Sequence, residues 1–141
     1  MIVVATEAEY KNLNIESEDV IITGVGYGNV YKALANLPRG TKILNIGYAG
    51  SNNIPIGTVC HIGECRSYHP NVKFNEAVYL LQTGDYICYS SNDFVLHTDI
   101  EESVLFDMEL YAILSMGFVN VEAIKIVSDN LSLKEYEKVE Q

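Results

Sequence analysis

The 141-residue chain is poor in basic residues, with nine Lys and Arg residues against nineteen Asp and Glu residues and a net charge of −10. So acidic a chain repels phosphate backbones, and nucleic acid is therefore not an expected partner. Cysteine and histidine are scarce as well, with three residues of each. Because the cysteines form no CxxC pair and no two histidines have the short helical spacing of a metal site, we expect neither a disulfide framework nor a bound metal. Cys60, Cys65 and Cys88 are interpreted as core or strand residues.

Long apolar runs are missing too. No window approaches the roughly 18 consecutive apolar residues of a membrane-spanning helix, so a membrane partner is not expected. The N-terminal sequence MIVVATEAEY has neither the basic segment nor the cleavage site of a secretory signal, which favours a cytoplasmic protein. The length is that of one ordinary domain, and we expect residues 1–141 to form it.

What the sequence does contain is a series of short apolar runs separated by helical patterns. Four runs have the composition of buried strands: MIVVA at 1–5, VIITG at 20–24, KILNIG at 42–47 and VEAIKIV at 121–127. Two segments repeat apolar residues at helical spacing: NVYKALANL at 29–37, which Pro38 ends, and MELYAILSMGF at 108–118. The spacing of Ser132 and Glu135 fits a capping box, which predicts a last helix there.

The middle of the chain is less regular. TVCHIGEC at 58–65 alternates like a strand, and YAGSNN at 48–53 predicts a glycine-bearing turn before it. Residues 66–94 are assigned to short antiparallel strands, with turns at His69-Pro70-Asn71 and Gly84-Asp85. The whole pattern predicts a single-domain α/β fold with a mixed central sheet and flanking helices.

The glycine cluster GVGYGN at 24–29 lies between a strand and a helix, where dinucleotides bind in some folds. The dinucleotide fingerprint is GxGxxG, but Asn29 stands in place of its last glycine, and a P-loop lysine is also absent. We therefore interpret the cluster as a tight turn and expect no cofactor. Its glycines still allow a small molecule to approach backbone N–H groups.

Three carboxylates lie at predicted strand ends: Glu9 after the first strand, Glu109 in FDME, and Asp129 in IVSDN. Ligands in α/β sheets bind at the carboxyl ends of the strands. Each carboxylate on its own fits a helix cap or a solvated loop residue. Their joint occurrence makes them candidates for acid–base chemistry.

Seven motifs, in this order along the chain, resemble the nucleoside phosphorylase and methylthioadenosine/adenosylhomocysteine nucleosidase superfamily: ATEAE, TGVG, NIGYAG, IGTV, SNDFV, DMELYA and KIVSDN. The resemblance implies a nucleoside phosphorylase-like fold in a trimmed form, because usual members are distinctly longer. It also implies an enzyme that cleaves the N-glycosidic bond of a purine nucleoside or thionucleoside. A homo-oligomer is expected as well, since family members complete their pockets with residues of a neighbouring subunit.

The resemblance assigns a role to each carboxylate. Glu9 would activate the attacking water, Asp129 would protonate or hydrogen-bond N7 of the purine, and Glu109 would bind the ribose hydroxyls. Glycosidic cleavage needs such a set, because the sugar becomes oxocarbenium-like and the departing base is a poor leaving group until a proton reaches it. One acid, one base and one group that binds the developing charge therefore fit the reaction.

The resemblance also predicts the residues that contact the substrate. Met108 would lie against the sugar, Phe94 would stack on the base, and the backbone of Val95 would read the edge of the base. The segment that contains Gly47, Tyr48 and Ala49 would border the substrate next to the nucleophile.

The co-substrate is either water or phosphate. Phosphorylases of this superfamily hold phosphate with an arginine two residues before the turn glycine and a hydroxyl residue after it; here these positions are Asn45 and Tyr48. Neither residue carries a cationic fork for phosphate. Lys125 falls where nucleosidases carry an arginine and would help to hold a water. Hydrolysis is therefore favoured, with phosphorolysis and non-catalytic nucleoside binding as the alternatives.

Overall fold

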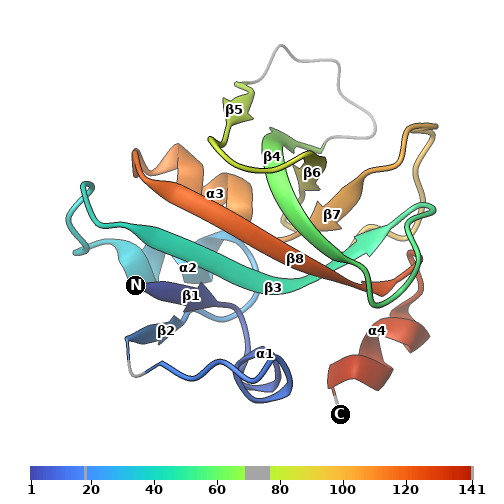
Figure 1. Ribbon diagram of the computed structural model, residues 1–141, viewed down its shortest axis with the longest axis horizontal. Coiled ribbons are helices and arrows are strands. Elements are labelled where there is room, and N and C mark those ends of the chain that lie inside the picture. Colours follow the sequence, from blue (N-terminus) through green and yellow to red (C-terminus); the bar gives the residue numbers. More distant parts are fainter. Residues whose placement is uncertain (18, 69–76, 141) are drawn as a thin grey trace.

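The computed structural model describes residues 1–17, 19–68 and 77–140 (Figure 1). In chain order the elements are β1 (Ile2–Val4), α1 (Glu7–Asn12), β2 (Val20–Ile22), α2 (Tyr27–Leu34), β3 (Ile43–Ser51), β4 (Val59–Ser67), β5 (Tyr79–Leu80), β6 (Tyr86–Ser90), β7 (Leu105–Asp107), α3 (Leu110–Ser115), β8 (Val121–Asp129) and α4 (Leu133–Glu140). The predicted α/β class is confirmed. The predicted turn at residues 69–71 lies outside the described residues.

The strands form one mixed sheet in the order β2-β1-β3-β7-β6-β4-β5, and β8 pairs with both β3 and β4. Strands β2, β1, β3 and β8 are mutually parallel where they pair. The antiparallel pairs are β3 with β7, β4 with β8, and β4 with β5. Because β8 joins β3 to β4, the pairings of β3, β7, β6, β4 and β8 close into a ring.

Three sequence-based predictions, about a strand region, a turn and a helix, are wrong in part. Strand β6 runs parallel to β4 and β7, so the region 66–94 is not uniformly antiparallel. Residues 48–51 of the predicted turn are instead the end of β3, which stays paired with β8 as far as Gly50, and the chain bends only after Ser51. The helix predicted at 108–118 is shorter, Leu110–Ser115, and it directly follows strand β7, which pairs with β3 and β6.

The predicted helices are present, and one more occurs. Helix α2 buries Val30 and Leu34 in a cluster shared with Ala112 and Ile113 of α3, and it ends before Pro38. Figure 1 shows α1 and α4 below the long strands β3 and β8, and the Asn12 side chain donates a hydrogen bond to the carbonyl of Val139 (2.7 Å). The C-terminal helix α4 is thereby held against α1, the helix that follows β1.

Helix α1 was not expected from the sequence, although its start follows a known pattern. Thr6 is the N-cap, and its hydroxyl accepts from the Glu9 N–H (3.1 Å) while the Glu9 carboxylate accepts from the Thr6 N–H (3.1 Å). This reciprocal capping box turns the Glu9 side chain back toward the end of β1.

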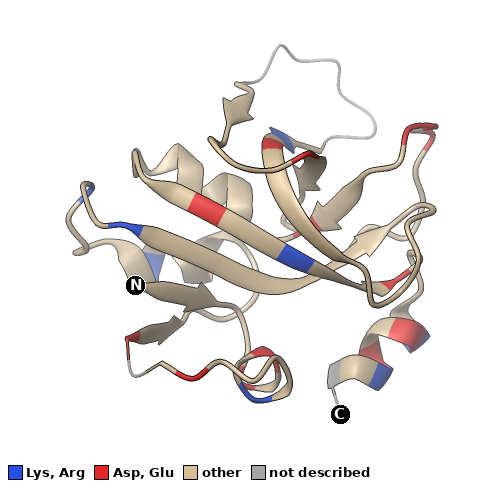
Figure 2. Ribbon diagram, in the orientation of Figure 1, with Lys and Arg blue, Asp and Glu red and all other residues tan. Residues whose placement is uncertain are grey.

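The three cysteines are free, buried and located in strands β4 and β6, as predicted. Acidic residues predominate among the coloured segments of Figure 2, and the middle of β8, the strand that contains Lys125, carries one basic band. Among the helices of the described residues, none has the length and apolar character needed to cross a membrane.

Candidate active site

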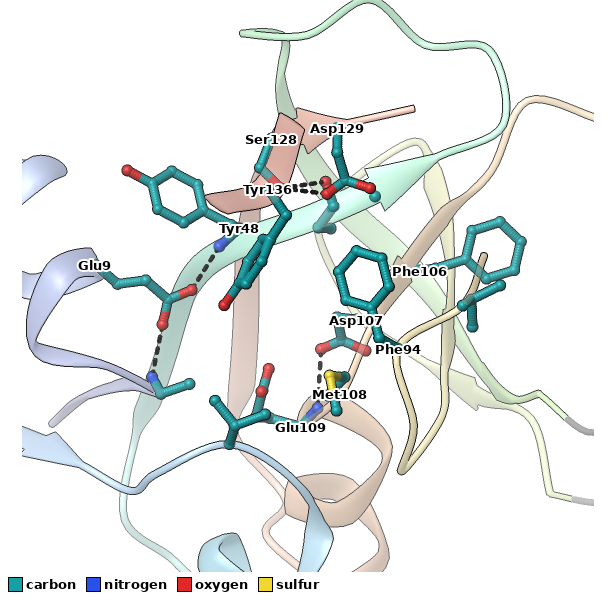
Figure 3. A pocket seen from close by; sticks show the side chains of 15 residues that line it. Glu9, Tyr48, Phe94, Phe106, Asp107, Met108, Glu109, Ser128, Asp129 and Tyr136 are labelled. Carbon is teal, nitrogen blue, oxygen red and sulfur yellow. Dashed lines mark hydrogen bonds between the residues drawn. The ribbon is translucent and has the colours of Figure 1, made fainter. Parts of the chain in front are cut away.

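A cavity lies where β1, β7 and β8 end, beside the second half of β3 (Figure 3). Helix α4 closes one side of the cavity through Tyr136, and α1 contributes Glu9 on another. Most of the predicted site residues line it: Glu9, Tyr48, Ala49, Phe94, Val95, Met108, Glu109 and Asp129. The sequence motifs are therefore gathered at one place, although they are spread over the whole chain.

Glu9 is almost fully buried, with 4% of its surface exposed, and its carboxylate accepts three backbone hydrogen bonds. Oε1 accepts from the N–H groups of Ala5 (2.8 Å) and Thr6 (3.1 Å), and Oε2 accepts from that of Tyr48 (2.7 Å). A carboxylate has about four acceptor positions, so one remains on Oε2 for a further donor. Burial raises the pKa of Glu9 above its ordinary value, although nearby Lys125 and the three amides lower it.

Asp129 at the end of β8 is 1% exposed and is also held by local donors. Oδ1 accepts from the Ser128 hydroxyl (2.7 Å) and Oδ2 from the Leu131 N–H (3.0 Å). Burial raises the pKa of the Asp129 carboxyl, and these hydrogen bonds only partly offset the increase. The group is thereby moved toward the protonated form that a general acid needs.

Two glycines of β3 make room for these two carboxylates. A Cβ at Gly47 would lie 2.5 Å from Oε2 of Glu9, and a Cβ at Gly50 would lie 2.8 Å from Oδ2 of Asp129. Real Cβ atoms do not approach other atoms so closely. Gly47 is thus not a wall of the cavity, as the sequence analysis expected of a substrate-binding residue; it provides the space that Glu9 fills.

Below the cavity, Lys125 forms a buried ionic cluster with two carboxylates. Its side chain is 1% exposed, and Nζ lies 3.1 Å from Oδ2 of Asp107 and 3.9 Å from Oε2 of Glu109. Lys125 therefore lies beneath the predicted site rather than on its surface. Its two partners, Asp107 and Glu109, do line the cavity, and only Glu109 was predicted from the sequence.

The members of this cluster have opposite pKa shifts. Burial raises the pKa of Glu109 to about 8, with help from the negative charges of Asp107 and Glu9, against the effect of Lys125. For Asp107 burial acts in the same direction, but the Lys125 ammonium and the Ser90 hydrogen bond outweigh it and hold the pKa below its usual value. Burial lowers the pKa of Lys125, and the neighbouring acidic groups, with Asp107 the largest contributor, more than reverse that effect.

Aromatic and apolar side chains line another part of the cavity. Phe94 comes from the segment between β6 and β7, and its ring centroid lies 5.3 Å from that of Tyr136. Figure 3 shows the phenol end of Tyr136 directed toward the side of Glu9 and Glu109, while the ring of Tyr48 points away from Glu109. The bulk of Tyr48 therefore does not fill the space beside Glu109.

Asp107 and Tyr136 are among the residues that line the cavity but were not predicted from the sequence. Asp107 directly precedes Met108 in a motif that had been singled out, so its position was an available signal. Tyr136 belongs to the helix predicted after Ser132, and nothing in the pattern of that helix marks it. Among the residues that the structure describes, no group of three or more His, Cys, Asp or Glu side chains is arranged to hold a metal ion.

Solved structures share this fold. A futalosine hydrolase of Helicobacter pylori strain 26695 has a TM-score of 0.76 at 14% identity, over 98% of this chain and 88% of that chain. The 5′-methylthioadenosine/S-adenosylhomocysteine (MTA/SAH) nucleosidase of Chlamydia trachomatis has a TM-score of 0.75 at 21% identity, over 98% and 84%. The MTA/SAH nucleosidase of Streptococcus pneumoniae, in complex with 8-aminoadenine, has a TM-score of 0.77 at 14% identity, over 99% and 91%.

At these identities the likeness establishes the fold, which is the nucleoside phosphorylase-like fold implied by the sequence motifs. Comparisons of the sequence with protein-family models and with curated proteins give no match.

Proposed function

We propose that the protein hydrolyses the N-glycosidic bond of a purine nucleoside or thionucleoside. The observation that carries this proposal is the convergence of Glu9, Glu109 and Asp129 on one cavity, each from a different element. These are the base, the hydroxyl-binding group and the acid that the reaction requires. The nucleosidases and the futalosine hydrolase that share the fold support the same reaction class.

In this mechanism a water donates a hydrogen bond to the free acceptor position of Glu9. The water oxygen attacks the anomeric carbon as the bond to the base nitrogen breaks, and Glu9 accepts the proton of the water. Asp129 donates its proton to the purine and so converts the base into a better leaving group. Glu109 accepts hydrogen bonds from the ribose hydroxyls, which strengthen as the sugar becomes oxocarbenium-like.

Water is a better co-substrate for this cavity than phosphate. The described residues that line the cavity include no Lys or Arg, but they include the carboxylates of Glu9, Asp107, Glu109 and Asp129. A phosphate dianion would meet the acceptor oxygens of these groups and the charged carboxylate of Asp107, without a cationic partner in direct contact. Asn45, at the position where phosphorylases carry an arginine, instead donates to the carbonyl of Val3 (3.0 Å).

The test is a panel of purine and pyrimidine nucleosides and thionucleosides, followed by chromatography with and without phosphate. We expect free base and free sugar, at a rate that phosphate leaves unchanged. Stimulation by phosphate with accumulation of ribose 1-phosphate would replace hydrolysis by phosphorolysis. Nucleoside binding without cleavage would make the protein a non-catalytic binder, and absence of binding would refute the proposal.

Two properties of the working protein belong to the same proposal, namely a homo-oligomer and a cytoplasmic location. An assembly would cover exposed apolar side chains such as Leu80 and Val119, which are 77% and 82% exposed. Sedimentation at micromolar concentration measures the assembly, and a monomer alone would contradict it.

A further inference from the structure

Asp107 lies at the centre of the buried cluster below the cavity, and its carboxylate is fixed from two directions. Oδ1 accepts the hydroxyl hydrogen of Ser90, which is its register partner in the neighbouring strand β6. Oδ2 accepts from the N–H of Leu110 (2.9 Å), in the first turn of α3. The Ser90 hydroxyl is itself held by the N–H of Tyr111 (3.0 Å). Strand β6 and helix α3 therefore leave this carboxylate little freedom to rotate.

The same carboxylate is the nearest counter-ion of Lys125. The distance from Nζ to Oδ2 of Asp107 is 3.1 Å, against 3.9 Å to Oε2 of Glu109. Removing an ammonium group from water costs several kcal/mol, so a buried lysine stays charged only with a close anionic partner. Asp107 is the largest of the groups that favour the charged form of Lys125.

Lys125 in turn acts on both candidate groups at the sugar side of the cavity. Its positive charge lowers the pKa of Glu9 and of Glu109, against the effect of burial. If Lys125 became neutral, both carboxylates would bind protons more readily, and Glu9 would be a less available base. Asp107 also accepts from the Glu109 N–H (3.4 Å), so it helps to orient the N-cap residue of α3 as well.

We infer that Asp107 is a positioning residue for the proposed hydrolysis, because it holds Lys125 charged and in place beneath Glu9 and Glu109. The inference rests on the proposed function for its catalytic meaning. Asp107 does not itself need to touch the substrate, since its two oxygens are already occupied by Ser90, Leu110 and Lys125. In this arrangement the pairing of β6 with β7 fixes Asp107, and Asp107 fixes Lys125. The charge of Lys125 in turn lowers the pKa of Glu9, the proposed base.

The main test is Asp107→Asn, which keeps the size of the side chain and removes its charge. Loss of a charged, buried partner is expected to lower kcat on the order of 10- to 100-fold, while KM changes by less than about 3-fold. Ser90→Ala, which keeps the Asp107 charge but loosens its position, should give a smaller loss of the same kind. Glu64→Gln is the matched control, because it removes a carboxylate from a salt bridge with Arg66 (3.0 Å) outside the cavity.

A double substitution separates positioning from a general loss of structure. Lys125→Met should reduce kcat strongly in the wild-type background. It should add little in the Asp107→Asn background, because Asp107→Asn has already removed the partner that keeps the Lys125 ammonium charged and in place. Independent, multiplying losses would overturn the inference. So would a rise in KM with unchanged kcat, which would place Asp107 in direct contact with the substrate.

A second measurement does not depend on activity. Two further ionisable groups act on Lys125, namely the thiol of Cys88 in β6 and the carboxylate of Glu9 in α1. NMR titration of the Lys125 ammonium should show a pKa above that of a free lysine in the wild type and a lower pKa in Asp107→Asn. Equal titration curves would overturn the inference. If the wild type cleaves no nucleoside, the proposed function fails, and this titration still decides whether Asp107 holds the ammonium.

Discussion

The two ends of the cavity are built in different ways. At the end where we propose that the sugar binds, here called the sugar end, Glu9 and Glu109 belong to helix starts, and both are near the buried ammonium of Lys125. At the end proposed for the base, here called the base end, Asp129 terminates a strand. Phe94 lies in the segment 91–104, which contains neither helix nor strand, and Tyr136 lies on the surface helix α4.

The two ends therefore differ in how rigidly their side chains are held. Charges that must act in the transition state are fixed by backbone amides and by a buried counter-ion, which need no rearrangement during the reaction. Phe94, the ring that would stack on the base, is instead attached to a segment without helix or strand. We therefore expect substitutions of the three carboxylates to change kcat, and substitutions of the aromatic residues to change affinity and base preference.

The largest effect is expected for Glu9→Gln. Glutamine retains most of the shape but cannot accept a proton from water, so kcat should fall by about 10² to 10⁴-fold. Nucleoside binding, measured by calorimetry, should stay within a few-fold of the wild type. A kcat that remains near the wild-type value would show that the base lies elsewhere and that the sugar end is not the site of proton abstraction.

Asp129→Asn is expected to have the next largest effect. The amide cannot donate a proton to the purine as an acid does, and kcat should fall by about 10²-fold or more. Substrates whose leaving group needs no protonation, such as nitrophenyl ribosides, should be cleaved almost as fast as by the wild type. An equal loss for both substrate types would contradict the role of Asp129 as the acid at the base end.

The strands and the three carboxylates were predictable, because buried parallel strands are rich in β-branched residues and the motifs keep their order. The second half of β3 was not, since glycine usually marks a turn. Gly47 and Gly50 are in this strand because two carboxylates need their space, and only the folded structure places Glu9 and Asp129 there. The Thr6 to Glu9 capping box was visible in the sequence and overlooked.

Strand β7 and the ionic cluster were beyond sequence reasoning for another reason. A strand of three residues, Leu105–Asp107, is too short to show a period, and it merges with the pattern of the helix that follows it. The pairing of Asp107 with Lys125 joins positions on two strands that do not pair with each other. Such a contact leaves no trace in spacing along the chain.

Gly47→Ala tests whether the backbone of β3 holds Glu9 in place at the sugar end. The added Cβ would lie 2.5 Å from Oε2 of Glu9, so the carboxylate must move away from the Tyr48 amide. We expect kcat to fall by about 10- to 100-fold, as for a lost hydrogen bond to a charged group. Gly40→Ala is the matched control, because no heavy atom lies within 4 Å of its Cβ position. Equal activity of the two variants would refute the steric argument.

Phe94→Ala probes the base end. Loss of a stacking ring should weaken nucleoside binding by about 1 to 3 kcal/mol and leave the kcat of bound substrate less affected. Phe118→Ala is the control, since Phe118 is a buried core residue outside the cavity and should lower stability without changing affinity. Unchanged affinity in Phe94→Ala would make Phe94 a packing residue and would contradict its proposed stacking on the base.

The last prediction concerns how the free energy of unfolding changes with pH. It distinguishes the contribution of Glu109 from that of Asp129. The pKa of Glu109 is raised to about 8 in the folded protein, above its ordinary value of 4.5, so the native state holds a proton that the unfolded chain has already lost. The stabilising contribution is therefore complete below the unfolded pKa and is lost as the pH rises through the folded value. Between pH 6 and 8, the free energy of unfolding should decrease by at most about 1.4 kcal/mol per pH unit. Chemical denaturation of Glu109→Gln should show a flatter profile than the wild type. Asp129→Asn should retain most of the slope, and a profile that Glu109→Gln leaves unchanged would contradict this assignment of the alkaline titration to the sugar end.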